Sequence, residues 1–375
     1  MSPVGGHPID MQSERFRPLL TSHGPFGSVY FEDLHNTADA DAQIELRWRA
    51  LREQLEQQGA DAALTESIGQ AIIDTHPAVG RSGRAVVASA DGVLVNEHLI
   101  RPTGPEVRVS PLPYIVPVVE HGDEHPTYVV AVVDHAGGDF MVNRGGVVAS
   151  DKVEGEGYPV HKASSAESPG YGDPQRTSDE ARHKNIREVA DRLTSLVDDI
   201  DPAAVFVVGE VQSRSDLVKE LPERVASLVM QLSVGARHSG FDDEQLQREI
   251  DQEFQRRRVA LIDEAAQRFQ AGLGHEPRMA TEGLDGVCAA LRAGAVETLI
   301  IGDFGDATVV AGDDLATVAP NPNVLSELGT APTQVLRADE ALPMLAVSTG
   351  AMLVRIDERI APADGVGAVL RYSLH

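Results

Sequence analysis

The chain has 375 residues, of which 24% are charged and 42% are hydrophobic, and its formal net charge is −26. This ordinary composition excludes a globally disordered or fibrous protein. The acidic balance excludes a protein that grips nucleic acid by bulk positive charge, so we expect no DNA partner. Any contact with RNA must be local and directed by shape. The bases are 28 Arg and only 4 Lys, which suits planar contacts with phosphate but is also typical of proteins from GC-rich genomes.

The cysteine content and the hydropathy of the chain indicate in which cellular compartment we expect it. Cys288 is the only cysteine, so disulfides within the chain and multi-cysteine metal sites are excluded, and a reducing cytoplasm is indicated. Cys288 lies in an apolar helical pattern, which predicts a buried structural thiol rather than a nucleophile. No apolar run is long enough to span a membrane, and residues 1–17 lack the pattern of a secretory signal, so we expect no membrane partner.

The first block of the chain covers about residues 1–125. After a loose start, the pattern predicts a strand at 26–31, helices at 42–57 and 62–74, and a hairpin of 84–88 with 93–95. Aromatic and β-branched content supports the first strand, apolar spacing supports the helices, and Asp91-Gly92 is a strong hairpin turn. Three prolines then mark the approach to the next block.

The second block covers about residues 126–278. It opens with a β-branched strand at 128–134 and a hairpin of 140–142 with 146–148. A long segment rich in Gly, Pro and Ser follows at 154–177, which is too long for a simple connector. The pattern then predicts a helix at 179–197, a buried strand at 204–209, a helix at 215–220, a short strand at 226–232 and a long charged helix at 242–272.

The third block covers about residues 279–375. It predicts a helix at 283–293, a core strand at 296–301, short strands at 308–310 and 315–318, and strands at 351–354 and 366–372, with 342–348 of mixed character. Strands that alternate with helices indicate layered α/β units. We therefore expect an α/β (α+β multidomain) protein with three domains at 1–125, 126–278 and 279–375.

The common motifs for catalysis and cofactors are missing. The chain has no phosphate-binding glycine loop, no dinucleotide fingerprint and no Gly-x-Ser-x-Gly elbow. His98, His121, His125 and His135 lack the spacing of a metal site and are expected to be exposed histidines between elements. In Gly302–Asp306, the aspartates after a strand suit either a ligand or, more simply, a turn. We expect no cofactor and no metal.

The segment 154–183 is the most informative part of the sequence. Between residues 140 and 187 there are seven bases and seven acids, whereas residues 1–80 carry five bases and twelve acids. Aromatic rings beside Arg and His fit contact with RNA, by stacking and by donation to phosphate, although a plain flexible loop is the alternative. In the first block, the most basic stretch is 81–108. The candidate rRNA-binding residues are Tyr158, His161, Lys162, Tyr171, Gln175, Arg176, Arg182, His183, Arg81 and Arg84. The Arg256-Arg257-Arg258 run is interpreted as a solvated helix face.

The order of the blocks resembles the archaeo-eukaryotic release factor and Pelota superfamily. The resemblance covers nearly the whole chain and is clearest from residue 128 onward. It rests on paired strands at 128–134 and 139–146, a helix segment at 184–193, a strand and following segment at 204–221, a helix–Gly–strand step at 291–301 and the closing strand at 365–372. Within the superfamily, the chain resembles the bacterial branch, and most closely the mycobacterial-type members related to the ribosome hibernation factor Balon.

The resemblance implies a three-domain protein that mimics the shape of tRNA. One domain of such a protein reaches the decoding centre, one reaches toward the peptidyl-transferase centre, and one contacts a translational GTPase or the stalk base. Release factors carry Gly-Gly-Gln on the loop of the middle domain, but the matching segment here reads Pro169-Gly170-Tyr171-Gly172-Asp173-Pro174-Gln175, and no Gly-Gly-Gln occurs in the chain. The Asn-Ile-Lys-Ser type of stop-codon motif is missing from the first block as well.

These departures shape the functional hypothesis. We expect a non-enzymatic hibernation factor that occupies the vacant A site of the ribosome, contacts rRNA of both subunits and protects idle ribosomes. A translational GTPase such as elongation factor Tu is a possible partner. The alternatives are a rescue factor that hydrolyses peptidyl-tRNA, with Gln175 or His183 orienting water, and a stress-linked interaction protein that keeps the fold without a ribosomal role.

Overall fold

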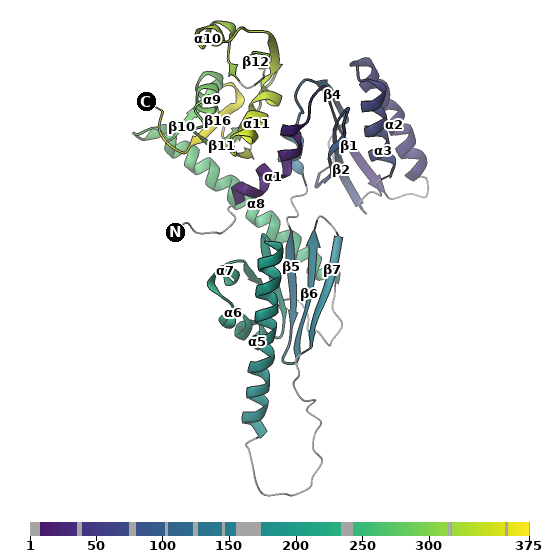
Figure 1. Ribbon diagram of the computed structural model, residues 1–375, viewed down its shortest axis with the longest axis vertical. Coiled ribbons are helices and arrows are strands. Elements are labelled where there is room, and N and C mark those ends of the chain that lie inside the picture. The colour runs from purple at the N-terminus through teal and green to yellow at the C-terminus, as the bar shows by residue number, and fades with distance from the viewer. Residues whose placement is uncertain are drawn as a thin grey trace, which may run out of the picture. The chain divides into compact units, whose positions relative to one another are not determined.

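A computed structural model describes residues 8–35, 40–74, 80–101, 104–122, 127–144, 147–154, 174–233, 243–313, 315, 317–356 and 359–374. The chain divides into two compact units (Figure 1). Unit 1 contains residues 1–6 and 124–257, and unit 2 contains residues 7–123 and 258–375. Both units mix helices with sheets, so the α/β prediction is confirmed. Among the described residues, no helix is both long and apolar enough to cross a membrane.

Unit 2 begins with a four-stranded antiparallel sheet in the order β3-β2-β1-β4. Its strands are β1 (Phe26–His35), β2 (Gly80–Ser89), β3 (Gly92–Leu99) and β4 (Glu106–Ser110). Helices α2 (Ala40–Gln57) and α3 (Ala62–Asp74) cover one face. Apolar side chains from Val29, Phe31, Leu55 and Ile68 fill that layer and are almost fully buried. The hairpin at Asp91-Gly92 forms as expected, because Gly92 adopts a φ of 130° that the turn requires.

The other face of this sheet shares a core with the C-terminal part of the chain. Helices α1 (Pro8–Thr21) and α4 (Val116–His121) lie in this core, together with α9 (Gly283–Arg292) and α11 (Ala338–Ser348). Tyr30 and Leu99 therefore belong to the same cluster as Val287, Leu299 and Leu342. The three-domain division stays a prediction, since the described residues of the first and third blocks form a single unit.

The C-terminal part of unit 2 holds two further sheets. One has the order β10-β16-β11-β15, and the other has the order β13-β12-β14. The first contains β10 (Ala280–Glu282), β11 (Val296–Ile301), β15 (Met352–Arg355) and β16 (Val366–Leu370). The second contains β12 (Thr308–Ala311), β13 (Val318–Ala319) and β14 (Gln334–Arg337), beside α10 (Pro322–Glu327). A 3-10 turn at Ala363–Gly365 precedes β16.

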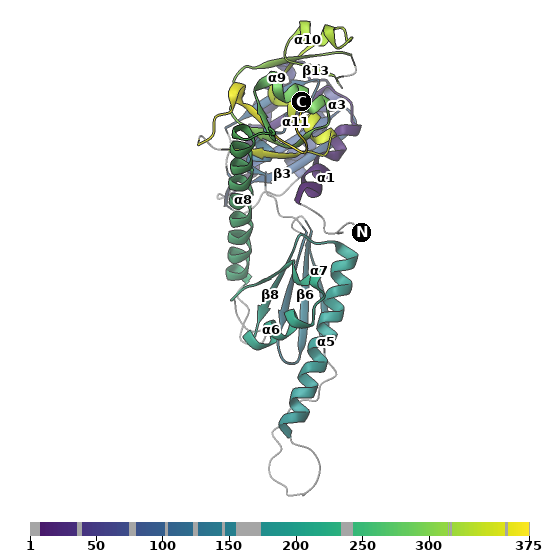
Figure 2. The same ribbon diagram turned by 90° about the vertical axis from the view of Figure 1, so that its left-hand side faces the viewer.

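Unit 1 is an open sheet in the order β7-β6-β5-β8-β9, with helices on both faces (Figure 2). Its strands are β5 (Tyr128–Val133), β6 (Gly137–Arg144), β7 (Val147–Glu154), β8 (Ala204–Gly209) and β9 (Val229–Gln231). Strands β5, β8 and β9 are parallel, whereas β6 and β7 pair as an antiparallel hairpin. Every residue of β5 is buried, as the continuous apolar run predicts for a strand covered on both faces.

The helices of unit 1 cover the sheet through two separate apolar clusters. Helices α5 (Pro174–Ile200), α6 (Val211–Glu220) and α7 (Glu223–Ala226) pack on one face around Val129, Phe140 and Leu193. The start of α8 (Asp243–Gly274) packs on the other face through Leu246 and Ile250. The later part of α8 belongs to unit 2, where the ring of Phe269 lies against Gly367.

The arginine run on α8 corrects one sequence-based interpretation. Arg256 pairs with Glu253 at 3.1 Å and its side chain is 68% exposed, as a solvated face predicts. Arg258 instead donates to the carbonyl oxygens of Val119 at 3.1 Å, of Gly122 at 3.3 Å and of Glu120. These carbonyls lie at the end of α4, where helices leave acceptors unsatisfied, so Arg258 caps that helix rather than facing solvent.

Candidate nucleic-acid interface

Helix α5 gives unit 1 an extension beyond its sheet (Figures 1 and 2). The helix begins at Pro174, which suits a first helical position because proline lacks the N–H that would be unpaired there. Among the described side chains of α5, which begin at Arg182, the first buried ones are Asn185 and Ile186, and further buried ones recur at helical spacing along the sheet. The first part of α5 therefore lies beyond the end of β5 and β8, next in sequence to the segment 155–173.

The carboxyl ends of the parallel strands β5 and β8 meet at this end of unit 1. Asp134 follows β5, and its Oδ1 accepts hydrogen bonds from the amides of Ala136 at 2.7 Å and Gly137 at 3.0 Å. Gly209 ends β8 with a φ of 119°, and a Cβ there would lie 2.0 Å from the carbonyl oxygen of Val133. In open α/β sheets, ligands bind outside this edge, where neighbouring connections diverge.

Four polar side chains converge on this edge. The Nδ1 of His135 lies 3.3 Å from Oε1 of Glu210, and the hydroxyl of Ser213 lies 3.3 Å from Oε2 of the same carboxylate. Asn185 donates to the carbonyl oxygen of His135 at 3.2 Å, while its own Oδ1 is buried without a hydrogen-bond partner. Because His135 and Glu210 are exposed, this edge offers both a donor and acceptors to a polar partner.

Arg182 joins the same end of the unit from α5. Its Nη2 lies 3.6 Å from Asp216, and its Nε has no hydrogen-bond partner. The pKa of Asp216 is lowered, first by the hydrogen bond from Gln212 and then, against some desolvation, by Lys219 and Arg182. Arg182 is therefore a partly exposed cation held beside a half-buried carboxylate whose lowered pKa keeps it ionised.

The geometry does not form a nucleophilic triad. Ser213 hydrogen-bonds to Glu210 and not to His135, so the imidazole is not placed to activate the hydroxyl. Within the part of the chain that the structure describes, no group of three or more His, Cys, Asp or Glu side chains could hold a metal ion. The arrangement suits binding of a polar surface.

The structure places the sequence-predicted residues unevenly. Tyr158, His161, Lys162 and Tyr171 lie outside the described residues. Gln175 and Arg176 lie in the first turn of α5, so the segment 154–183 is not a loop throughout. Arg182 and His183 lie on the same helix, with His183 exposed. For Gln175, Arg176 and Arg81, which lies on β2, the side chains are outside the described part of the structure.

Arg84 is corrected by the structure. Its side chain is 1% exposed, and its guanidinium donates to Asn96 Oδ1 at 3.0 Å and to the carbonyl oxygen of Ala71 at 2.7 Å. The buried carboxylate of Asp33 lies 3.9 Å away. Burial lowers the pKa of Arg84, and Asp33 opposes that shift. Arg84 is thus a structural cation under α3 and is removed from the proposed RNA-contacting set.

The sequence alone does not bring His135, Glu210, Asn185 and Ser213 together, as the structure does. A signal was present, because two strongly β-branched strands end in Val133-Asp134-His135 and Val208-Gly209-Glu210. Asp303 and Asp306 also follow a strand and, from the sequence, suit either a ligand or a turn. There the simpler interpretation holds for Asp303, since its Oδ1 accepts from the amide of Gly305 at 3.0 Å and so closes a turn.

Comparison with known proteins gives the family. A family model, bacterial archaeo-eukaryotic release factor family 2, matches residues 127–275. Two uncharacterized proteins of Mycobacterium tuberculosis, from strains H37Rv and CDC 1551, are each 51% identical to the chain over 364 residues, which is 97% of this chain and 97% of theirs. The chain belongs to the bacterial archaeo-eukaryotic release factor family.

Solved structures of the superfamily are more distant from this family member. A model of ribosome-bound archaeal Pelota with ABCE1 is 16% identical, with 99% of this chain and 96% of the other covered, at a TM-score of 0.41. Pelota of Archaeoglobus fulgidus is 15% identical, with 78% and 84% covered, at a TM-score of 0.34. The family assignment confirms the resemblance drawn from the sequence and supports a ribosome-associated translation factor of the release-factor type. The relation to Balon stays a prediction.

The family match also gives the candidate interface its context. The matched residues 127–275 contain all of the sheet of unit 1, the segment 155–173 and helix α5. His135, Arg182, Asn185 and Glu210 therefore lie inside the region that defines the family. The polar end of unit 1 is the part of this family member in which a contact with RNA is best sought.

Proposed function

We propose that this family member is a ribosome hibernation factor that occupies the vacant A site and protects idle ribosomes without catalysing peptide release. One observation carries the proposal: a chain of the release-factor family lacks Gly-Gly-Gln, and the glutamine that comes nearest to it, Gln175, follows Pro174 inside a helical turn. A proline fixes its own φ and removes a donor, whereas a glycine pair leaves the backbone free. The backbone that presents Gln175 therefore differs from the motif of a release factor.

The charge distribution supports binding through a few local contacts. The whole chain carries a net charge of −26, whereas residues 140–187 are balanced. At the polar end of unit 1, Arg182 and His183 add donors to the bases of the neighbouring segment. Such a surface approaches RNA with one end and leaves the acidic remainder away from phosphate. In this proposal, the end of unit 1 faces rRNA of the large subunit and the N-terminal block faces the decoding centre.

Co-sedimentation with ribosomes tests the proposal directly. The purified chain is mixed with vacant 70S ribosomes and with 70S ribosomes whose A site is filled by tRNA, with and without elongation factor Tu. We expect binding to vacant ribosomes that tRNA abolishes. Binding that tRNA leaves unchanged would contradict occupation of the A site, and no binding under any of these conditions would leave the fold without this function.

A variant set tests the surface. Replacing Lys162, Tyr171, Arg176 and His183 together by Ala should weaken ribosome binding at least about tenfold, since several phosphate and stacking contacts of about 1 kcal/mol each are removed. Arg256→Ala is the matched control, because Arg256 is an exposed cation on α8 whose recorded pairing is with Glu253. Equal affinity for both variants and the unaltered chain would exclude the end of unit 1 as the RNA-binding surface.

A peptide-release assay distinguishes the alternative function, hydrolysis of peptidyl-tRNA, from hibernation. A rescue factor would release labelled peptide from a stalled ribosomal complex, and Gln175→Ala or His183→Ala would abolish that release. We expect no release above the rate without protein. Release that depends on either residue would replace hibernation with rescue as the function.

A further inference from the structure

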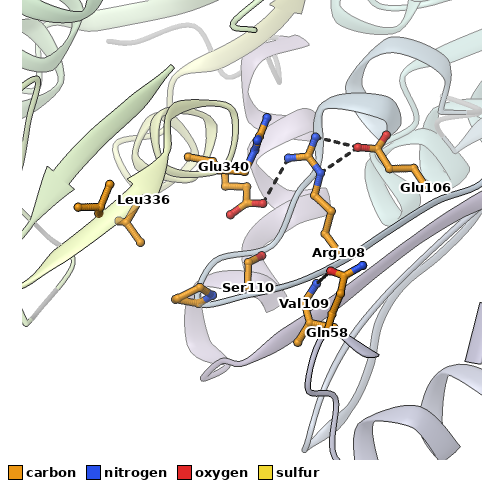
Figure 3. Close-up of a pocket in the computed structure, with 10 residues that line it drawn as sticks. Gln58, Glu106, Arg108, Val109, Ser110, Leu336 and Glu340 are labelled. Atoms are coloured by element: carbon orange, nitrogen blue, oxygen red, sulfur yellow. Dashed lines mark hydrogen bonds and ion pairs between the residues drawn. The ribbon is translucent and has the colours of Figure 1, made fainter. Parts of the chain in front are cut away.

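A cavity of about 450 Å³ lies inside unit 2, between two strand edges (Figure 3). One wall is β4, with Arg108, Val109 and Ser110, and the other wall is β14, with Val335 and Leu336. Each of these strands is the last strand of its sheet among the described residues. The cavity, which we term the β4–β14 slot, therefore runs between two edges that lack a neighbouring strand. Its volume lies within the range of ordinary ligand sites.

The side-chain amide of Gln58 forms hydrogen bonds with the outer edge of β4, in the way that the backbone of a neighbouring strand would. The amide of Gln58 donates from Nε2 to the carbonyl oxygen of Val107 at 2.8 Å and accepts at Oε1 from the amide of Val109 at 3.0 Å. These two backbone groups flank Arg108. In a parallel sheet, one residue of the adjoining strand makes the same pair of bonds with its own N–H and C=O. Gln58 thus takes the place of one peptide unit of an added strand.

Gln58 can leave this position without disturbing a core. It is exposed, and it follows the last residue of α2 just before Gly59, whose φ is 90°. None of the apolar clusters of the described residues contains it. Its hydrogen bonds are the two to β4 and two from its own backbone amide to the carbonyl oxygens of Gln54 and Leu55 at the end of α2. Protein edges are commonly protected in this way against pairing with other chains. A protecting group of this size is displaced by a true strand, which offers the same two bonds and more along its length.

The two arginines that line the slot, Arg108 and Arg337, are surrounded by an excess of carboxylates. Arg108 contacts Glu106 at 2.7 Å, Asp339 at 3.0 Å and Glu340 at 3.3 Å, and it stacks on the ring of Tyr114 at 3.4 Å. Arg337 contacts Asp339 at 3.0 Å and Asp306 at 3.7 Å. These two guanidinium groups are thus paired with four carboxylates, of which Glu106 and Glu340 line the slot itself and Asp306 and Asp339 lie next to its lining. Of these carboxylates, Glu106 and Asp306 are the more exposed, at 39% and 103% of the side chain, and they favour a cation in the incoming segment.

The opposite wall offers an apolar contact. Val335 on the edge strand β14 lines the slot and is 71% exposed, while its neighbour Leu336 is buried in the unit 2 core. An added strand alternates its side chains between two faces, so apolar and charged side chains can alternate along it and meet Val335 and the carboxylates in turn. This combination selects an extended segment in which an apolar residue alternates with Lys or Arg.

We propose that the β4–β14 slot binds an extended segment of another protein that carries Lys or Arg side chains. The segment adds to the edge of β4 in place of the Gln58 amide, and Glu106 and Asp306 receive its cations. Backbone bonds to β4 supply affinity and the carboxylates supply selectivity, as in other cases of strand addition. The site is separate from the polar end of unit 1 and does not depend on its function.

Fluorescence anisotropy with labelled pentapeptides tests the proposal on the full chain. The probes are Val-Lys-Val-Lys-Val, the acidic counterpart Val-Glu-Val-Glu-Val, and the lysine peptide with N-methylated backbone amides, all with blocked ends. We expect the lysine peptide to bind, the acidic peptide to bind at least about tenfold more weakly, and the methylated peptide not to bind, because it cannot donate to β4.

Variants then locate the site. Gln58→Ala removes the competing amide and should tighten binding of the lysine peptide about fivefold, whereas Gln57→Ala, at the exposed preceding position, should leave it unchanged. Glu106→Gln should weaken binding about threefold. Hydrogen exchange at the Val109 amide should speed up in the Gln58→Ala chain and slow again when the peptide is added.

Several results would overturn the proposal. These are no binding of the lysine peptide to either the unaltered chain or Gln58→Ala, equal binding of the methylated peptide, and an unchanged affinity in Gln58→Ala. Any of them would leave Gln58 as a protecting group for the edge of β4 and nothing more. Circular dichroism of each variant confirms that the compared chains are folded.

Discussion

Replacement of Arg84 by Met tests whether this arginine holds unit 2 together. The guanidinium donates to Asn96 Oδ1 from Nε at 3.1 Å and from Nη2 at 3.0 Å, and to the carbonyl oxygens of Ala71 at 2.7 Å and Ile72 at 3.3 Å. The two carbonyls lie in the last turn of α3, where a cation also meets the negative end of the helix dipole. Methionine fills much of the space but donates no hydrogen bond.

The expected cost follows from what the substitution leaves behind. Asp33, 3.9 Å from Arg84 and 1% exposed, would remain as a buried carboxylate without this cation. Breaking a buried ion pair by removing one partner costs about 3–5 kcal/mol. For a unit of this size, each kcal/mol lowers the melting temperature by roughly 2–4 °C, so Arg84→Met should lower it by about 10 °C.

Urea and thermal unfolding of four chains measure this effect. Arg52→Met is the control, because Arg52 forms an exposed pair with Glu56 on α2 and should change stability by less than about 0.5 kcal/mol. The double variant Asp33→Asn, Arg84→Met should recover about 1–3 kcal/mol, since the buried charge is then gone. A loss below about 1 kcal/mol in Arg84→Met would refute the structural role. A specific fall in ribosome binding by the folded variant would return Arg84 to the RNA-contacting set.

Further predictions concern the strand end, the arginine run and the thiol. Gly209→Ala should destabilise unit 1 by about 3 kcal/mol or more in urea unfolding, because φ is 119° and the new Cβ would lie 2.0 Å from the carbonyl oxygen of Val133; a neutral effect would contradict this geometry. Arg258→Met should speed hydrogen exchange in α4 and cost about 2 kcal/mol, whereas Arg256→Met should do neither; equal effects would refute the capping role. Burial raises the pKa of Cys288 to about 12, so the thiol should react with Ellman's reagent at pH 8 only after unfolding, and prompt labelling of the folded chain would show that it is accessible.

Local patterns in the sequence predicted much of the fold. The runs at 128–133 and 204–209 are so rich in Val that only buried strands suit them, and the structure has both. Helices α2 and α3, with apolar residues at regular spacing, and α8, expected as a long charged helix, are likewise predicted close to their observed bounds. In these elements the structure follows from one apolar face or one apolar run, so residues close in sequence are enough to predict it.

Elements buried on every side were harder to predict. Helix α11 is buried from Ala338 through Met344 and contains Pro343, so it shows no polar face and no helical period. Helix α1 was expected to be loose, yet Phe16 is completely buried in the unit 2 core. Strands β4 and β14 are short, and prolines or polar residues surround them. Their pairing depends on partners far away in sequence.

The candidate sites depend on tertiary structure in the same way. Arg84 and Arg256–Arg258 look alike in sequence, as bases among charged or apolar neighbours. Only the fold distinguishes Arg84, which lies under α3, from Arg256, which lies in solvent. The hydrogen bonds between the Gln58 side chain and the edge of β4 join residues about fifty positions apart, and no local sequence pattern predicts them.

The shared core of unit 2 determines the order in which the two units can fold during synthesis. Tyr30, Val87 and Leu99 on the first sheet belong to one apolar core with side chains from α9, α11 and β11, which follow only after residue 282. In the sequence, most of unit 1 comes between these segments. It can therefore fold before unit 2 is complete, because a chain leaves the ribosome from its N-terminus. An unfinished chain that ends at residue 275 should therefore bind a hydrophobic dye strongly, whereas the complete chain should not. Until its last hundred residues emerge, this apolar core stays incomplete and accessible to chaperones and to other unfinished copies.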